Sequence, residues 1–84
     1  MPREESGAKV HLFRSALSGA RVIAKGNRIR DVKRLVDQYG GKASRWVKKS
    51  SPRFEAGGQR FEYHWYEHHG IGRFETKKVQ LNSP

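Results

Sequence analysis

Polar side chains that can move protons or bind phosphate are concentrated in the last third of the chain: His64, Tyr66, Arg73, Glu75 and Lys77. Together they are the kinds of side chain needed to cleave RNA without a metal. In that reaction the ribose 2′-hydroxyl attacks the neighbouring phosphorus. A base must take the hydroxyl proton, an acid must protonate the departing 5′-oxygen, and cations must balance the charge on the phosphate. These residues are therefore a candidate catalytic group.

Each of these side chains has a candidate role. His64 suits acid or base duty because imidazole changes its protonation near neutral pH. Glu75 could be the complementary base or could orient His64. Arg73 and Lys77 could clamp the phosphate, with arginine binding it in a bidentate fashion. Tyr66 could stack on a base or donate to a phosphate oxygen.

A period of two in the sequence predicts the strands that would position this group. Residues 53–56, the pair Gly57-Gly58 and residues 59–68 read as a β-hairpin, and a second turn at residues 69–72 leads into a third strand over residues 73–80. Along the second strand we expect Phe61, Tyr63 and Trp65 to face the core. The residues expected on the open side are Arg60, Glu62, His64, Tyr66 and His68.

Burial of the aromatic residues predicts the register between the second and third strands. If Trp65 lies opposite Phe74 on the core face, His64 faces Glu75 and Tyr66 faces Arg73. The same register places Glu62 opposite Lys77. A slip of one residue would expose the aromatic side chains, so burial constrains the pairing.

The upstream sequence predicts helices. Apolar residues recur at three- and four-residue steps from Val10 to Ala20, which indicates a helix ending near Ser18-Gly19. Residues 21–24 are a short β-prone run. A clearer helix is expected to begin with Asn27 as N-cap and to end at Gly40-Gly41. Its apolar face would carry Ile29, Val32, Leu35, Val36 and Tyr39.

The next segment, residues 42–49, resembles a short helix or turn with Trp46 and Val47 directed inward, and Pro52 ends it. Trp46 and Trp65 fit core positions better than base-stacking platforms. The predicted class is α+β, with N-terminal helices packed on a small antiparallel sheet. We expect a flexible segment over residues 1–8, one domain over residues 9–81 and a tail over residues 82–84.

Charge points to a polyanionic partner. The 84 residues include 18 Lys and Arg against 8 Asp and Glu, for a net charge of +10, and a basic surface attracts nucleic acid. One cluster, Arg28, Arg30, Lys33 and Arg34, lies on the main predicted helix. The predicted nucleic-acid contacts outside the catalytic group are Lys42, Arg45, Lys48, Lys49, Arg53 and Arg60. No apolar stretch is long enough to span a bilayer, and no signal peptide is recognisable.

Metal chemistry is not expected. The chain has no cysteine, and His64 and His68 would stand roughly 13 Å apart along a strand. Two other interpretations of the charged residues stay open. Opposite charges on a solvated sheet are ordinary cross-strand pairs, so the chain could be a non-catalytic RNA- or DNA-binding module. Its basic face could also dock on an acidic protein.

Several segments together resemble a known family. The segments are residues 27–32, residues 35–41, residues 46–51, the run His64-Trp65-Tyr66-Glu67, and the spaced residues Gly72, Phe74, Glu75 and Lys77. They resemble the C-terminal toxin domains of contact-dependent growth inhibition and other polymorphic bacterial toxin systems. The resemblance covers most of the chain from about Arg21 onward.

This resemblance implies a fold, an activity and partners. The fold would be the helix-plus-antiparallel-sheet arrangement shared by barnase, EndoU, colicin-type ribonucleases and RelE. The activity would be that of an endoribonuclease that cleaves tRNA and needs no cofactor. Such domains are delivered into the cytoplasm of a target cell and are neutralised by a cognate immunity protein. Some of them also depend on a host translation factor such as elongation factor Tu.

Overall fold

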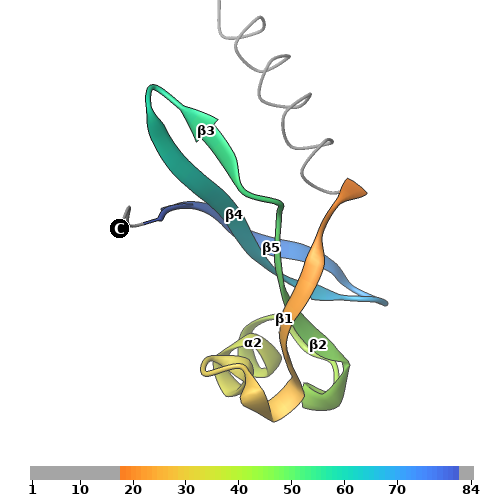
Figure 1. Ribbon diagram of the computed structural model, residues 1–84. Helices are drawn as coiled ribbons and strands as arrows, with labels where there is room; N and C mark the ends of the chain where they lie inside the picture. The colour runs from red at the N-terminus through yellow and green to blue at the C-terminus, as the bar shows by residue number, and fades with distance from the viewer. Residues whose placement is uncertain (1–17, 82–84) are drawn as a thin grey trace, which may run out of the picture.

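Residues 18–81 are described by the computed structural model, and they form one antiparallel sheet with a single α-helix at one end (Figure 1). The strands are β1 (Arg21–Lys25), β2 (Trp46–Ser50), β3 (Phe54–Ala56), β4 (Gln59–His68) and β5 (Gly72–Gln80), and the helix is α2 (Val32–Tyr39). The architecture agrees with the predicted α+β class. The helix expected between Val10 and Ala20 lies, apart from its last residues, outside the described part of the chain.

β4 is the central strand of the sheet. It pairs with β5 over residues 61–68, with β2 over residues 64–68 and with β3 over residues 59–61. A strand has two edges, so β2 and β3 follow one another along one edge and β5 occupies the other. β1 extends the sheet beyond β2. The predicted hairpin with its Gly57-Gly58 turn is confirmed by β3 and β4.

The segment predicted as a short helix or turn is mostly strand. A 3₁₀ turn covers Ala43–Arg45, and β2 begins directly at Trp46. Trp46 is fully buried, in agreement with the expectation, while Val47 is half-buried. β2 lies between β1 and β4, and pairing on both edges outweighs the weak strand signal of its Lys48 and Lys49 positions.

The predicted helix exists but begins later than expected. Asn27 lies within a 3₁₀ turn over Gly26–Arg28, and Ile29 takes an extended conformation at φ −76° and ψ 121°. A helix cannot run through an extended residue, so the N-cap is Asp31 and not Asn27. The C-terminal prediction is confirmed. Gly40 ends α2 at φ +94°, where glycine avoids a side-chain clash, and its N–H donates to the Val36 carbonyl.

The core lies between α2 and one face of the sheet. Ile29, Val32, Leu35 and Trp46 are buried there, with Tyr39, Tyr66 and Phe74 packed against them. The Trp46 indole N–H donates to the Gly40 carbonyl at 3.0 Å, which ties the end of α2 to the start of β2. Figure 1 shows this helical end opposite the β3–β4 turn.

The predicted facing of β4 is therefore wrong in part. The side of β4 expected to be open carries Tyr66, which α2 covers. On the other side Trp65 is buried, as expected, but it is not a member of the core cluster of α2. Phe61 and Tyr63 are only half-buried. Aromatic residues occur on both faces of β4, so aromatic alternation alone could not identify the face that the helix covers.

A β-bulge in β5 changes the predicted register. Phe74 pairs with Tyr66 and not with Trp65, and Lys77 pairs with His64. Between these pairs, Glu75 and Thr76 together oppose the single residue Trp65. Glu75 takes φ +60°, a conformation that no other non-glycine residue adopts among residues 18–81. The expected pairs of His64 with Glu75, Tyr66 with Arg73, and Glu62 with Lys77 are consequently absent.

Candidate functional site

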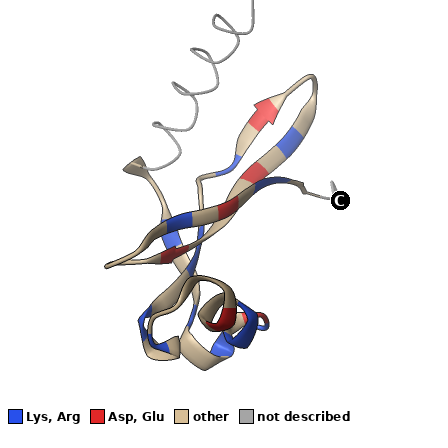
Figure 2. Cartoon of the chain, turned by 180° about the vertical axis from the view of Figure 1, so that it is seen from behind, with Lys and Arg blue, Asp and Glu red and all other residues tan. Residues whose placement is uncertain are grey.

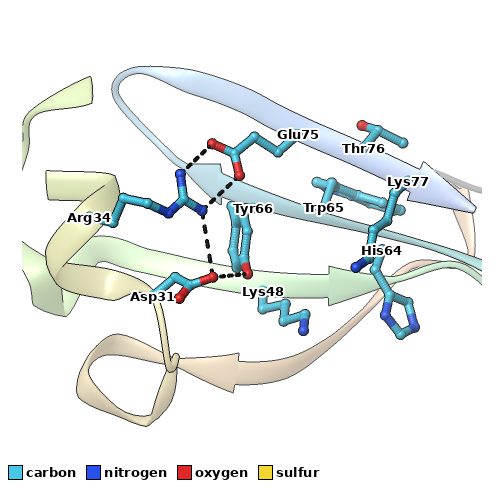
Figure 3. Close-up of a pocket in the computed structure, with 9 residues that line it drawn as sticks. All are labelled: Asp31, Arg34, Lys48, His64, Trp65, Tyr66, Glu75, Thr76 and Lys77. Atoms are coloured by element: carbon cyan, nitrogen blue, oxygen red, sulfur yellow. Dashed lines mark hydrogen bonds and ion pairs between the residues drawn. The ribbon is translucent and has the colours of Figure 1, made fainter. Parts of the chain in front are cut away.

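Two adjoining pockets lie where the N-terminal end of α2 meets the sheet. The first has a volume of about 370 Å³ and is lined by Asp31, Arg34, Lys48, His64, Trp65, Tyr66, Glu75, Thr76 and Lys77 (Figure 3). The second, of about 410 Å³, is lined by Ala24, Arg28, Ile29, Arg30, Asp31, Lys48, Tyr66 and Lys77. Asp31, Lys48, Tyr66 and Lys77 line both. We call the two pockets together the groove.

The groove brings together most of the predicted catalytic group. His64, Tyr66, Glu75 and Lys77 all line the first pocket. Arg73 does not line either pocket. It pairs in register with Glu67. Burial raises the pKa of Glu67, but hydrogen bonds from Trp65 and Lys49 and, to a smaller extent, the charges of Lys49 and Arg73 lower it on balance. Its predicted role as a phosphate clamp beside His64 therefore has no support in this geometry.

The predicted nucleic-acid contacts are mostly dispersed. Lys48 lines both pockets. Lys49, its neighbour, points the opposite way and forms an ion pair with Glu67 at 3.0 Å. Arg60 lies 3.9 Å from Glu55 in the β3–β4 hairpin. The remaining members, which are exposed outside the groove, are Lys42, Arg45 and Arg53.

Apart from Arg34 of α2, which is paired with Glu75, the cations of the groove come from the segment before α2, from β2 and from β5. Arg28 and Arg30 line the second pocket beside Lys48 and Lys77. The view in Figure 2 shows Lys and Arg positions both on the strands and at the helical end of the molecule. Arg28 and Arg30 were noted in the sequence as basic residues of the predicted helix. The turn that precedes α2 aims them at the groove.

His64 is held by a buried carboxylate. Its Nε2 lies 3.0 Å from Oε1 of Glu62, which is only 7 % exposed. Ser50 donates to the same oxygen at 2.9 Å, and Arg21 donates to Oε2 at 3.3 Å. The hydrogen bond from His64, with smaller contributions from Ser50 and Arg21, lowers the pKa of Glu62 to about 2.

The ionised state of Glu62 fixes the tautomer of His64. An ionised carboxylate only accepts hydrogen bonds, so Nε2 of His64 carries the proton and donates it to Glu62. In the neutral ring Nδ1 is then the basic nitrogen. The sequence placed Glu62 on the same strand face as His64 but did not identify it as the partner. The Glu-x-His spacing within a strand was the available signal.

Glu75 forms hydrogen bonds with side chains of α2 and not with His64. Its two carboxylate oxygens accept hydrogen bonds from Arg34 at 2.8 and 2.9 Å, and one of them accepts from the Tyr39 hydroxyl at 2.8 Å. The bond from Arg34, followed by that from Tyr39, lowers the pKa of Glu75 to about 2. Figure 3 shows the imidazole of His64 turned away from this pair. The expected pairing of Glu75 with His64 is therefore absent, and the predicted role of Glu75 as a base has no support in this geometry.

Tyr66 links the two pockets. Its hydroxyl lies 3.4 Å from Oδ2 of Asp31, and the Lys48 ammonium lies 5.8 Å from the centre of its ring. Burial, and then the charge of Asp31, raises the pKa of Tyr66. The hydroxyl is therefore protonated at neutral pH and can donate. Asp31 itself was not among the predicted site residues.

Comparison with known proteins found no relative of this chain. No family model matches the chain, and no curated protein or solved structure matches it. The groove must therefore be interpreted from its own chemistry. Within residues 18–81, no helix combines the length and apolar composition that a membrane span requires. The same part of the chain groups no three His, Asp or Glu side chains in a way that could hold a metal ion.

Proposed function

We propose that this protein binds RNA in the groove and cleaves it without a metal, by attack of a 2′-hydroxyl on the adjacent phosphorus. The observation that carries the proposal is the His64–Glu62 pair at the edge of a pocket that Lys48, Lys77 and Tyr66 also line. An oriented imidazole beside cations is the minimum that this reaction needs. The net charge of +10 favours the approach of a polyanion.

The proton transfers follow from the hydrogen bonds. Nδ1 of His64 takes the proton of the 2′-hydroxyl while Glu62 stabilises the imidazolium that forms. The 2′-oxygen bonds to phosphorus, the bond from phosphorus to the 5′-oxygen breaks, and a 2′,3′-cyclic phosphate remains. Tyr66 is the candidate donor to the departing 5′-oxygen. It stands two residues from His64 on the same face of β4, roughly 7 Å away along the strand, so that a phosphate fits between them.

The two lysines would stabilise the transition state. Lys77 pairs in register with His64, and Lys48 pairs with Tyr66. Their ammonium groups thus approach the space between base and acid from the two neighbouring strands. Figure 3 shows both side chains reaching toward that end of the pocket. Cations in this position balance the negative charge that grows on the phosphate oxygens.

The biological setting follows from the family resemblance of the sequence. On that basis we propose that the chain is the toxic domain of a secreted bacterial effector that acts on tRNA in the cytoplasm of a target cell. A cognate immunity protein would neutralise it, and elongation factor Tu is a candidate cofactor protein for substrate delivery. The groove supports the ribonuclease part of this proposal, since it supplies cations and an oriented imidazole in one place.

A gel assay tests the enzymatic proposal. Total bacterial RNA is incubated with the full chain in the presence of EDTA. A parallel reaction contains elongation factor Tu and GTP-Mg²⁺ and no EDTA. We expect discrete tRNA fragments with the unaltered chain and with His69→Ala, an exposed histidine outside the groove. His64→Ala should leave the RNA intact while its circular dichroism spectrum is unchanged.

The alternative function is a non-catalytic RNA- or DNA-binding module. The hydrogen bond between Tyr66 and Asp31 favours it, because it engages the proposed acid with a neighbouring side chain. That alternative predicts salt-sensitive RNA binding and intact RNA in every reaction, with no effect of His64→Ala on affinity beyond a few-fold. Fragments that appear equally with the His64→Ala protein would show that another site or a contaminant cleaves.

A further inference from the structure

Asp31 is an acidic side chain placed at the junction of the two pockets. It lines both of them, and 45 % of its side chain is exposed. Around it stand Arg28, Arg30, Lys48 and Lys77. The other carboxylate of the groove, Glu75, is saturated by Arg34 and Tyr39, whereas Asp31 makes only longer contacts. An exposed carboxylate in a groove for phosphates opposes binding unless it serves recognition.

Helix capping does not account for Asp31. It occupies the N-cap of α2, where an aspartate commonly accepts a hydrogen bond from an N–H of the first turn. Its side chain makes no such bond. Oδ2 instead lies 3.4 Å from the Tyr66 hydroxyl and 3.6 Å from Nη2 of Arg34, and both distances are long for a charge-assisted bond. The carboxylate therefore keeps capacity to accept hydrogen bonds from a ligand.

The second pocket has the composition of a base site. Ala24 and the buried Ile29 give it an apolar part, Tyr66 adds an aromatic ring, and Arg28 and Arg30 add planar cations. Nucleobases are recognised by stacking on such groups together with hydrogen bonds to their edges. The first pocket, with His64, would then hold the phosphate. Asp31 lines both pockets and would lie beside the edge of a base held in the second.

We propose that Asp31 selects guanine in the second pocket. This inference rests on the proposed binding of RNA in the groove. A carboxylate accepts hydrogen bonds only, and guanine presents two donors side by side, N1–H and one hydrogen of the 2-amino group. Adenine and cytosine place an acceptor beside their amino group, and uracil places its single N–H between two carbonyl oxygens. Each of the other bases would therefore bring an acceptor against Asp31.

Short oligoribonucleotides test the selection. The substrates are uridine pentamers whose central residue is G, A, C or U, and both binding and cleavage are measured. Binding is measured by fluorescence anisotropy in the His64→Ala background, so that cleavage does not interfere. We expect the guanine pentamer to bind at least about tenfold more tightly than the others, as one bidentate contact allows.

Asp31→Asn should remove the preference, because the amide replaces one acceptor by a donor. A purely structural role of Asp31 would instead change the affinity for all the pentamers by the same factor and leave their ratio intact. Asp37→Asn is the matched control, on an exposed position of α2 that lines neither pocket. Asp31→Ser is a second variant that keeps a good N-cap residue if the asparagine variant folds poorly.

The outcomes separate the two proposals. Guanine preference that survives both Asp31 variants, or an unaltered chain that binds all the pentamers alike, overturns the role of Asp31 and leaves RNA binding standing. A preference for the guanine pentamer without any cleavage supports the role of Asp31 and overturns the proposed enzymatic activity. Absence of binding to every pentamer and to total RNA overturns the proposed function and with it the inference.

Discussion

Arg34 on α2 donates to both carboxylate oxygens of Glu75 on β5, across a separation of 41 residues in the chain. The Tyr39 hydroxyl binds the same carboxylate, and the Tyr39 ring stacks on Phe74 with 4.1 Å between ring centres. Phe74 and Glu75 are consecutive in β5, yet both contact α2 at the bulge. α2 is thereby fixed to the strand that carries Lys77.

The junction predicts a positioning effect of Arg34 on activity. Arg34→Lys keeps the charge but loses the bidentate geometry. If the groove cleaves RNA as proposed, cleavage should fall by roughly tenfold to a hundredfold, because a small displacement of a pocket wall is costly for catalysis. The unfolding midpoint should fall only slightly. Lys33→Ala, at a neighbouring exposed position outside the groove, is the control, and equal loss in both variants would contradict the positioning effect.

Lys48 and Lys49 provide a matched test of the groove. They are adjacent in β2, yet Lys48 lines both pockets and Lys49 pairs with Glu67 away from the groove. If the groove binds RNA, Lys48→Gln should reduce the slope of log affinity against log salt by about one. Lys49→Gln should leave the slope unchanged. The measurement is a salt titration of RNA binding, and similar slopes for both variants would place the RNA elsewhere.

The Glu62 network predicts acid sensitivity. The pKa of Glu62 is lowered to about 2 in the folded protein, so its contribution to stability is complete above the ordinary carboxyl pKa of 4.5 and is lost as the pH falls toward 2. Glu62→Gln should cost about 1–3 kcal/mol at pH 7. The difference in unfolding free energy between the Glu62→Gln variant and the unaltered chain should be markedly smaller at pH 3. Urea unfolding at both pH values measures it.

The control for this acid effect is Glu55→Gln. Glu55 is 74 % exposed in its side chain and lies 3.9 Å from Arg60, so its contribution should be near zero at either pH. A Glu62→Gln deficit that stays constant between pH 7 and pH 3 would mean that shape, and not charge, makes Glu62 stabilising.

The core predicts a large effect for a single truncation. Leu35 is fully buried between α2 and the sheet. Leu35→Ala should cost about 2–5 kcal/mol of unfolding free energy, since it removes transfer energy and leaves a cavity. Much of the total stability of a domain this small would be lost. Val22→Ala, at a position that is 53 % exposed, should change little by comparison.

The two glycines after α2 form another matched pair. Both have positive φ, +94° at Gly40 and +80° at Gly41. A Cβ at Gly40 meets nothing within 4 Å, whereas a Cβ at Gly41 would lie 2.5 Å from Nε2 of His68. Gly40→Ala should cost about 1–3 kcal/mol from the backbone alone, because its φ of +94° and ψ of −168° lie in a region that is essentially limited to glycine. Gly41→Ala should cost more, because the His68 ring also packs edge-on against Trp46.

Thermal unfolding of the two alanine variants checks this order. Equal midpoints would show that His68 moves aside freely. His68 is half-buried and its Nδ1 accepts a hydrogen bond from the Gly70 N–H at 3.0 Å, so such freedom is not expected.

Sequence reasoning succeeded where local rules decide the structure. Gly57-Gly58 between alternating residues predicted the β3–β4 hairpin, and Gly40-Gly41 predicted the end of α2. It failed where distant contacts decide. The strand character of Trp46–Ser50 depends on pairing with β1 and β4, and the bulge at Glu75 depends on Arg34 and Tyr39.

The candidate site shows the same division. The side chains His64, Tyr66 and Lys77 were recognised by type and do line one pocket. The partner of His64 was misassigned because the register was wrong by one residue on one side of the bulge and by two on the other. Asp31 was not predicted as a site residue, because its position in the groove depends on how α2 packs against Tyr66.

The strand order determines when the groove comes into existence during folding. The hairpins β3–β4 and β4–β5 join residues that are close in the chain and can close early. The pairing of β1 with β2 must close a loop that contains α2, and the pairing of β2 with β4 must close a loop that contains β3. Closing these longer loops costs more entropy. A partly folded chain with only these hairpins thus presents His64 and Tyr66 on β4 but lacks the groove walls that β2 and the segment before α2 supply. If the groove binds RNA as proposed, affinity for RNA should therefore arise only in the last folding step.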